Sequence, residues 1–407
     1  MKSFIQYLKE ETDAEEKGAP LMHLRHLEDD PIHSGHEGVA RSAQFLDDVH
    51  SHLLGKQTST HVSTKYDGAP SIVYGIHPKT NKFFVGTKSV FNKNPKINYT
   101  DEDIDANHGH APGLAAKLKE ALQHLPKIMP RKGGVFQGDF MYGKGDVKKE
   151  KNKSSFTPNT ITYSTPSNGA EGKKITNSKI GMVTHTEYKG KGDLSNMSAG
   201  PLSPEKRSEF EHHPDVNHID PIDKPNPSNY TPDEQRKFEM HREAARKAYG
   251  SMKPEAYDAI KGQGTEIEAH INDRIKENAK PSVHGLIDHM TSRHEKEIAK
   301  LKTPAVIDRK KQLFSQKLQQ AHTNSEHLKK IFDLHNHMQE AKNILTGVMA
   351  KNSKFENHIN GTPTAPEGAV AVNKKGEMTK FVDRGEFSRS NFAKGKPGQE
   401  KKEETDA

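Results

Sequence analysis

Alternating apolar and polar residues predict several short β-strands along the chain. Residues 61–75 read as a β-prone run, a charged turn at 65–68 and a second, alternating run. Further strands are predicted at 133–142, 179–188, 366–372 and 378–382. The last two strands flank the turn-forming residues 373–377, so they predict a β-hairpin.

Apolar residues at helical spacing predict amphipathic helices between these strands. One helix, at residues 36–54, carries Val39, Ala43, Leu46, Val49 and Leu53. It is expected to pack on the domain that starts at Lys65. A second helix is marked by Leu114, Leu118, Ala121, Leu122 and Leu125. After Asp233 the pattern stays helical for most of the next hundred residues.

The expected fold class is α+β, in which an antiparallel-sheet domain is interrupted by a mainly helical insertion. The boundaries are an N-terminal segment 1–20, the first part of the sheet domain 21–190, a polar linker 191–232, the helical insertion 233–354, the second part 355–391 and a disordered tail 392–407. An insertion of this size requires that its two ends leave and re-enter the sheet domain close together.

Amino-acid composition excludes some classes of site and partner for this chain. The chain has no cysteine, which excludes disulfides, thiolate metal sites and cysteine nucleophiles. No apolar stretch is long enough to span a bilayer, so we expect a cytoplasmic protein without a membrane partner. A net charge of +7 gives a mild preference for phosphate-bearing partners. Only 31% of residues are hydrophobic and the mean hydropathy is −0.95, so parts of the chain must be well solvated.

The first chemical candidate is Lys65, within the sequence Lys65-Tyr66-Asp67-Gly68. A lysine on a turn between two strands can lie at the floor of a pocket. There, desolvation or a nearby cation lowers its pKa and frees the amine for nucleophilic attack. Asp67 is placed to orient the ammonium group or a bound ribose. Taken alone, this short pattern favours a solvated hairpin turn, and the order and company of the other segments change that interpretation.

Other polar residues on the predicted strands complete the candidate site. Asp139 lies among apolar and aromatic residues, where a carboxylate needs a partner such as a ribose hydroxyl or a metal. The aromatic end of the strand that contains Tyr188 is suited to cover a base. The predicted hairpin brings Glu367 and Lys380 to one cleft, where one would hold a divalent cation and the other would contact a phosphate.

In this order, the segments resemble the covalent nucleotidyltransferase superfamily, which comprises ATP-dependent DNA ligases, RNA ligases and messenger RNA capping enzymes. The matching segments are Lys65 to Gly68 for motif I, Gly86-Thr87-Lys88-Ser89 for motif Ia, Gly138-Asp139 for motif III, Ile180 to Tyr188 for motif IIIa, Glu367-Gly368 for motif IV and Lys380 for motif V. The resemblance covers about half of the chain, residues 60–190 and 360–385.

The resemblance implies an antiparallel-sheet, ATP-grasp-like ligase domain and an ATP-dependent polynucleotide ligase that uses Mg²⁺ or Mn²⁺. The roles it implies are nucleophile for Lys65, assistance from Asp67 and Lys88, ribose or metal contact for Asp139, base stacking for Tyr188, metal binding for Glu367 and α-phosphate contact for Lys380. The implied partner is RNA or a nicked duplex with 5′-phosphate and 3′-hydroxyl ends.

The sequence departs from the superfamily pattern in three ways. Asp139 replaces the usual glutamate, Lys380 has no second lysine two residues away, and Lys88 stands where motif Ia usually has an arginine. No OB-fold domain is evident after motif V. RNA ligases also lack that domain, so the pattern leans towards RNA or an unusual nick.

The whole chain is also similar to uncharacterised proteins of T-even-like tailed phages. The segments that carry this resemblance are 26–29, 90–100 and 108–114. Two alternatives to ligation therefore remain open. One is a virion or assembly protein that retained a ligase-like fold without catalysis, and the other is a nucleic-acid-binding module. Covalent labelling by ATP separates the ligase from both, and co-purification with particles would favour the virion protein.

Overall fold

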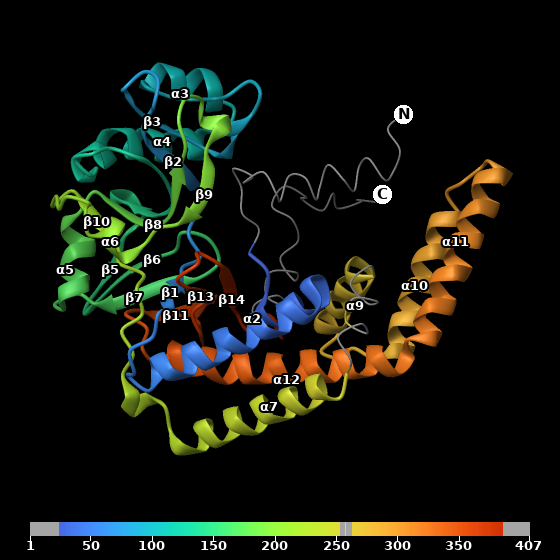
Figure 1. Ribbon diagram of the computed structural model, residues 1–407. Coiled ribbons are helices and arrows are strands. Elements are labelled where there is room, and N and C mark those ends of the chain that lie inside the picture. Colours follow the sequence, from blue (N-terminus) through green and yellow to red (C-terminus); the bar gives the residue numbers. More distant parts are fainter. Residues whose placement is uncertain (1–23, 253–256, 258–262, 386–407) are drawn as a thin grey trace, which may run out of the picture.

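The structure is a computed structural model, and it describes residues 24–252, 257 and 263–385 (Figure 1). The expected N-terminal segment 1–20 and the tail 392–407 lie outside the described residues. Among the helices that are described, none combines the length and apolar character needed to cross a membrane. The fold is α+β, and its three sheets are almost entirely antiparallel.

The β structure consists of three sheets. In spatial order, the small sheet contains β1 (His61–Lys65), β13 (Gly368–Val372) and β14 (Met378–Phe381). The large sheet contains β10 (Val216–His218), β8 (Ile180–Lys189), β4 (Val135–Gly143), β2 (Ser71–Ile76) and β3 (Phe83–Gly86), with β9 (Ser198–Pro201) also paired to β8. The third sheet contains β12 (Thr362–Thr364), β11 (Glu356–Ile359), β7 (Thr162–Pro166), β6 (Lys153–Phe156) and β5 (Lys148–Glu150).

The α-helices surround the sheets and extend well beyond them. They are α2 (Asp30–Leu53), α3 (Asp101–His108), α4 (Pro112–His124), α5 (Ala170–Asn177), α6 (Pro204–Arg207), α7 (Pro232–Gly250), α9 (Gly264–Lys276), α10 (Val283–Ile298), α11 (Pro304–Thr323) and α12 (Ser325–Ala350). Short 3-10 helices are η1 (Leu27–Asp29), η2 (Lys88–Phe91), η3 (Leu125–Ile128), η4 (Lys144–Asp146), η5 (Leu194–Asn196) and η6 (Pro227–Asn229). The strands and helices predicted by periodicity are therefore confirmed.

Strand alternation decides which face of the large sheet is covered. On β2 and β4, Tyr74, Phe136 and Phe140 point to one side, where they pack in one cluster with Leu118 of α4. Because side chains alternate along a strand, Gln137 and Asp139 point to the opposite side of β4. The polar residues of this strand are thus kept out of the core that α4 covers.

The small sheet separates the helices from the rest of the sheet structure. Val62 of β1, Ala369 and Ala371 of β13, and Phe381 of β14 are buried in the same core cluster as the helices. The strand register places these residues on one face, so the residues between them face the large sheet.

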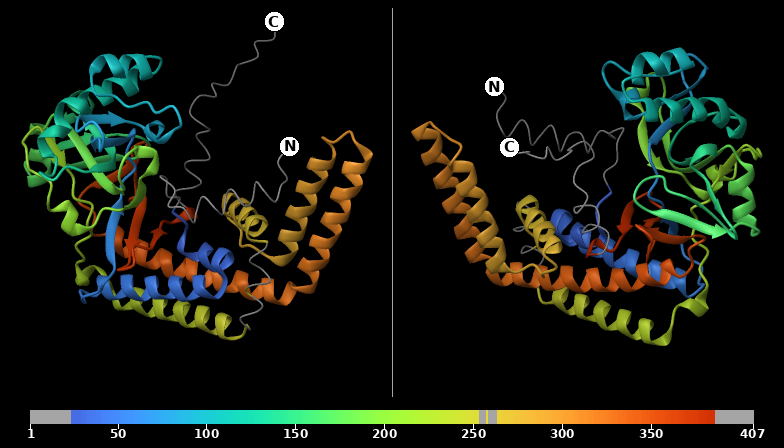
Figure 2. Two further views of the ribbon diagram at one scale, coloured as in Figure 1. Left: turned by 45° about the horizontal axis from the view of Figure 1, so that its top comes forward. Right: turned by 180° about the vertical axis from the view of Figure 1, so that it is seen from behind.

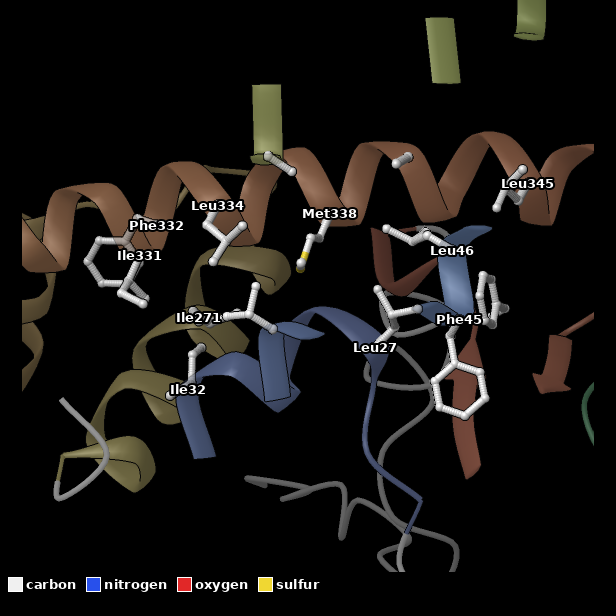
Figure 3. Packing of buried hydrophobic residues seen from close by; sticks show 14 of the residues in the cluster. Leu27, Ile32, Phe45, Leu46, Ile271, Ile331, Phe332, Leu334, Met338 and Leu345 are labelled. Carbon is white, nitrogen blue, oxygen red and sulfur yellow. The ribbon is translucent and has the colours of Figure 1, made fainter. Parts of the chain in front are cut away.

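The helical segment 233–354 shares its hydrophobic core with α2. Leu27, Ile32, Phe45 and Leu46 pack against Ile271 of α9 and several residues of α12 (Figure 3). The helical residues 233–354 are therefore not a separate domain, because their core includes α2 and the small sheet. On α2 the predicted face is slightly rotated, since Ala43 is exposed and Phe45 is buried.

The segment 191–232, predicted as a polar linker, belongs to the sheet structure instead. It contains β9, which pairs with β8 in antiparallel fashion, and β10, which pairs with β8 in parallel. Its polar composition hides these strands because each is only three or four residues long. Such short strands carry too few residues for alternation to stand out.

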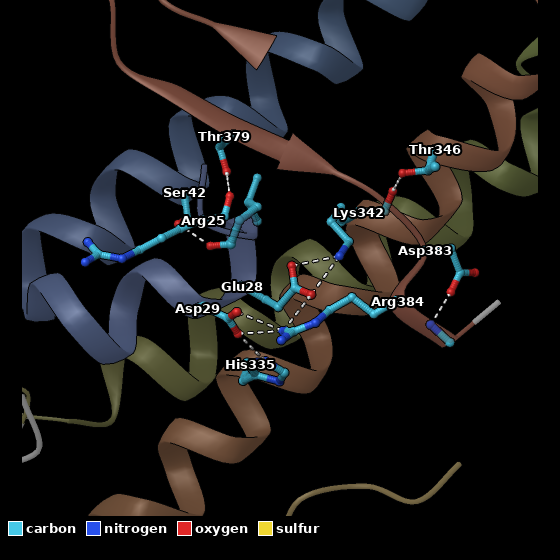
Figure 4. Close-up of polar contacts among 12 residues, drawn as sticks. Arg25, Glu28, Asp29, Ser42, His335, Lys342, Thr346, Thr379, Asp383 and Arg384 are labelled. Carbon is cyan, nitrogen blue, oxygen red and sulfur yellow. Dashed lines mark hydrogen bonds and ion pairs between the residues drawn. The ribbon is translucent and has the colours of Figure 1, made fainter. Parts of the chain in front are cut away.

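A buried network of charges ties three distant parts of the chain together (Figure 4). Lys342 of α12 donates hydrogen bonds of 2.7 and 2.8 Å to Glu28, and Arg384 donates bonds of 2.8 and 2.9 Å to Asp29. His335 Nε2 lies 3.2 Å from Asp29. Burial alone would raise the pKa of Glu28, but Lys342 and the other nearby cations lower it to about 2. Both carboxylates are therefore ionised and paired.

We predict that Lys342→Met strongly destabilises the protein, because it leaves the Glu28 carboxylate buried without its cation. Removal of one partner of a buried pair costs about 3–5 kcal/mol of unfolding free energy. Urea denaturation followed by circular dichroism measures the loss. The matched control is Lys329→Met on the exposed side of the same helix, which should change stability by less than about 0.5 kcal/mol. Equal effects of the two substitutions would contradict a structural role for the network.

Candidate functional site

Lys65 is the last residue of β1, and its amine contacts the carboxylate of Glu367. The register of the small sheet produces this contact, because Lys65 pairs with Gly368, the residue directly after Glu367. The Lys65 side chain is 31% exposed and that of Glu367 is 12% exposed. The amine thus has one side towards solvent and the other towards a buried carboxylate.

Gly368 allows the chain to enter β13 directly after Glu367. Its φ is +144°, a conformation that residues with a side chain rarely adopt. A Cβ atom at this position would lie 2.2 Å from the carbonyl oxygen of Phe381 on β14. The Glu-Gly order is therefore required by backbone geometry, and not only by the chemistry of the glutamate.

Lys380 approaches the same pair from the neighbouring strand. It pairs with Val370, which pairs in turn with Ser63, two residues before Lys65. Directly paired residues of antiparallel strands point to the same face, so Lys65 and Lys380 lie on one face of the small sheet. Burial, and then the charge of Lys65, lower the pKa of the Lys380 amine.

The environment of Glu367 has the opposite effect on its carboxyl group. Burial raises the pKa of Glu367, and the charges of Asp67 and Asp139 add to that rise, while Lys65 opposes it. Its second oxygen, Oε2, is buried and has no hydrogen-bond partner among the described residues. A buried acceptor without a partner is uncommon in folded proteins and marks this carboxylate as a candidate for ligand contact.

A cavity of about 200 Å³ opens between the small sheet and the large sheet, next to Lys65. The small sheet contributes Ser63, Val370 and Met378 to its lining. The large sheet contributes Val183 and Gln137, and further lining comes from β9 and from α6. The walls are mostly apolar and carry a few polar groups, which is the usual arrangement of a small-molecule site.

Four of the seven residues predicted for the site line this cavity, namely Lys65, Lys88, Asp139 and Tyr188. Glu367 and Lys380 do not line it, but the pKa of each responds to the charge of Lys65. All seven residues are thus brought together by the fold, because the charge of Asp67 also acts on Glu367. Because they come from five separate segments of sequence, their convergence is a property of the tertiary structure.

Asp67 does not line the cavity either, but its charge contributes to the raised pKa of Glu367. Its carboxylate accepts hydrogen bonds from Asn159 Nδ2 and from the backbone amides of Thr160 and Ile161. Its own backbone amide donates to the hydroxyl of Tyr163 at 2.7 Å. In this structure Asp67 fixes the turn after Lys65 against the third sheet, and its predicted contact with the ammonium or ribose stays a prediction.

Lys88 and Tyr188 contribute differently to the cavity. Lys88 lies in η2, is exposed, and forms no ion pair with any residue in the described part of the chain. The ring of Tyr188 is buried beside Phe91, and its hydroxyl donates a 2.5 Å hydrogen bond to Gln137. Tyr188 therefore forms part of the wall, whereas Lys88 supplies a cation at the rim.

Three further cavity residues escaped the sequence analysis, namely Gln137, His185 and Arg207. His185 Nε2 lies 3.6 Å from Asp139. Gln137 lies two residues before Asp139 on β4, so strand alternation places both side chains on one face. That spacing could have identified Gln137 as a site residue. No such signal existed for Arg207, because it lies in the segment predicted as a linker.

The oxygen ligands near Lys65 suit a hard cation that arrives with a ligand. No described group of three or more His, Asp or Glu side chains is arranged to hold a metal by itself. Magnesium commonly binds one or two carboxylates together with substrate phosphates. The unpartnered Oε2 of Glu367, with Asp139 in electrostatic range, fits such a shared site.

Comparison with known proteins identifies the family of this chain. A model described as a family of unknown function (DUF6267) matches residues 22–396, so the chain belongs to that family. No match was found among curated proteins or among solved structures.

We predict that Gly368→Ala disrupts the site through the backbone. The added Cβ must displace the carbonyl of Phe381, and the strained conformation alone costs about 1–3 kcal/mol. The urea midpoint of unfolding should fall accordingly. Gly145→Ala is the control, since nothing lies within 4 Å of a Cβ at that position, and it should leave the midpoint unchanged. A Gly368→Ala protein as stable as the control would contradict the assigned geometry.

Proposed function

We propose that the protein is a nucleotidyltransferase of the polynucleotide ligase type, in which Lys65 carries the nucleotide covalently. One observation carries this proposal. A single lysine amine lies at the edge of a cavity, beside a buried carboxylate with an unsatisfied oxygen and within the field of a second lysine. The order of motifs along the sequence supports the same chemistry.

The first step requires a neutral amine at Lys65. Glu367 contacts that amine, and burial raises the pKa of the carboxyl group. A carboxylate with a raised pKa is a better proton acceptor than an exposed one. Glu367 therefore takes a proton from the Lys65 ammonium, and the lone pair that is released on Nζ becomes available for attack.

The covalent step is an in-line displacement at the α-phosphorus of a nucleoside triphosphate. A bond forms between Lys65 Nζ and phosphorus, and the bond from phosphorus to the bridging oxygen breaks. Pyrophosphate leaves with the electron pair, and the second amine proton passes to solvent. The product is a phosphoramidate that joins the nucleoside monophosphate to Lys65.

Cations around Lys65 balance the charge that develops on the phosphate. Lys380 lies on the same face of the small sheet and Lys88 lies at the rim of the cavity. Such preorganised charges stabilise a transition state without reorganisation during the reaction. A divalent cation bound to the triphosphate would supply further charge neutralisation, and Glu367 and Asp139 are the residues that would hold it.

The cavity walls provide a site for the nucleoside. We assign the base to the apolar lining that includes Val370 and Val183, and the ribose to Asp139 and Gln137, the polar lining residues of β4. Tyr188 supports this wall through its hydrogen bond to Gln137. Its buried ring makes His185, which is partly exposed and lines the cavity, the better candidate for direct stacking on the base.

Ligation requires two further transfers. The nucleotide passes from Lys65 to the 5′-phosphate of a nucleic acid, and a 3′-hydroxyl then displaces it to form a phosphodiester. The antiparallel sheets on either side of the cavity support a nucleotidyltransferase domain of the ligase kind, with the helices packed behind its small sheet.

We predict that radiolabelled ATP or GTP with Mg²⁺ labels the protein covalently. Lys65→Arg should abolish labelling while keeping a cation beside Glu367, because a guanidinium is too basic to act as a nucleophile. The measurement is labelled protein on a denaturing gel, with the four nucleotides compared. Lys56→Arg, at an exposed lysine before the start of β1, should label like the unaltered protein. Failure of the unaltered protein to label with any nucleotide would refute covalent transfer.

The rate of labelling should depend on pH with a maximum between two limbs. Rising pH first increases the rate because Glu367 loses its proton and becomes a base. This acid limb lies at higher pH than the titration of an exposed glutamate, because the pKa of Glu367 is raised. A further rise in pH decreases the rate because Lys380 loses its charge. This alkaline limb lies at lower pH than the titration of an exposed lysine, because the pKa of Lys380 is lowered.

Two variants test these assignments separately. Lys380→Arg keeps its charge at high pH, so the alkaline limb should move to higher pH. Glu367→Gln should remove the acid limb and slow labelling by about 10²–10⁴-fold, the usual contribution of a general base. An alkaline limb that stays in place in Lys380→Arg would show that another group is responsible.

A further inference from the structure

The helices α10 and α11 form an arm that projects from the rest of the molecule (Figure 2). The arm and the β-sheet lobe stand at opposite ends of α12 and rise on the same side of it, while α7 lies on the other side (Figure 1). The arm joins the main core through the buried residues Leu286, Met290 and Ala321, and the partly buried Val283, Ile287 and Phe314 pack against that core. Packing of the main core therefore does not explain why the chain extends into the outer half of the arm.

The outer half of the arm carries a net positive charge. Residues 293–311 contain seven lysines and arginines against three acidic residues, a net of +4, whereas all 407 residues together carry +7. Exposed basic residues without an ion pair in the described part of the chain are Arg293, Lys296, Lys300, Lys302, Arg309 and Lys311. Lys310 is different, because it pairs with Glu297 and thereby links the two helices.

Helix α10 places two of these charges on one face, because Arg293 and Lys296 lie three residues apart. Lys300 follows in the turn after the helix ends at Ile298. The helix beneath them is held in place by the stacking of His294 on Phe314, whose ring centroids lie 4.0 Å apart. A cluster of exposed cations without ion pairs among the described residues is suited to a polyanion.

We propose that this arm binds the phosphodiester backbone of the acceptor nucleic acid, and its role as an acceptor clamp rests on the proposed function. The alternative of a membrane surface fits less well, because such helices need a broad apolar face. Among exposed large apolar side chains, the described arm has only Val306 and Leu313, at 41% and 50% exposure. Most of its other exposed residues are charged or polar.

The structure also gives the length of nucleic acid needed to reach both sites. Helix α12 has 26 residues, which corresponds to about 39 Å. At about 3.4 Å per base pair, a nucleic acid held at the cavity and at the arm must extend roughly a dozen nucleotides from the reacting end. Shorter acceptors would contact the lobe alone.

The test compares binding of nicked DNA and of single-stranded RNA by the full-length protein, using fluorescence anisotropy over a range of salt concentrations. The arm variant is Arg293→Gln/Lys296→Gln/Lys300→Gln, in which glutamine preserves helix propensity. The control variant is Lys148→Gln/Lys149→Gln/Lys151→Gln, which removes equal charge from exposed residues around β5, on the far side of the lobe from the arm (Figure 1).

We expect the arm variant to weaken binding by roughly 10- to 100-fold and to lower the slope of log affinity against log salt by about 2–3, since each phosphate contact contributes about 0.7–0.9. The control variant should bind like the unaltered protein. The effect of the arm should vanish for acceptors shorter than roughly a dozen nucleotides. The relative losses for DNA and RNA show which of the two the arm holds.

Covalent labelling of the same variants keeps this inference separate from the proposed function. Arm-dependent binding without any labelling would leave the arm as a nucleic-acid site and refute the ligase chemistry. Normal labelling, with equal binding by the arm and control variants, would overturn the arm assignment. Arm-dependent binding to anionic lipid vesicles, with unchanged nucleic-acid binding, would overturn it in favour of a membrane.

Discussion

The buried pairing of Glu28 with Lys342 and of Asp29 with Arg384 is the constraint on which the candidate site depends. Glu28 and Asp29 lie in η1, Lys342 lies on α12 and Arg384 lies just after β14, so the network joins the two ends of the described chain. The adjoining backbone contact from Lys380 N to Arg25 O fixes β14 directly. The hairpin that carries Glu367 and Lys380 is thereby held at a defined distance from Lys65.

Burial of such charges costs solvation free energy that their mutual attraction offsets only with good geometry. An apolar core of similar volume could supply equal stability, so the network is better understood as a source of specificity. The network forms in only one arrangement of η1, α12 and the segment after β14, because a displacement of any of these elements would leave a buried charge unpaired. Accurate placement matters most for a site assembled from separate segments, where small displacements of reacting groups are costly.

The same electrostatic principle operates with a different outcome at Lys65. Glu367 is largely buried, though less completely than Glu28, its cation is partly exposed and one of its oxygens has no partner among the described residues. The fully satisfied pair has a lowered carboxyl pKa, whereas the incompletely satisfied one has a raised pKa. One chain thus contains a carboxylate that serves structure and another that is available for chemistry, and the difference lies in how completely each is compensated.

Amino-acid order alone determined the strands that carry Lys65, Asp139 and Tyr188, and the hairpin that follows Glu367, because alternation and turn residues act over short distances. It also predicted the long helices from their apolar spacing. It could not find β9 and β10, whose few residues show no period, nor the contribution of Arg207 to the cavity. Only the tertiary structure decided that Asp67 bonds to a neighbouring turn and that the helices share one core with α2. Each of these depends on contacts between residues about a hundred or more positions apart, which no local pattern encodes.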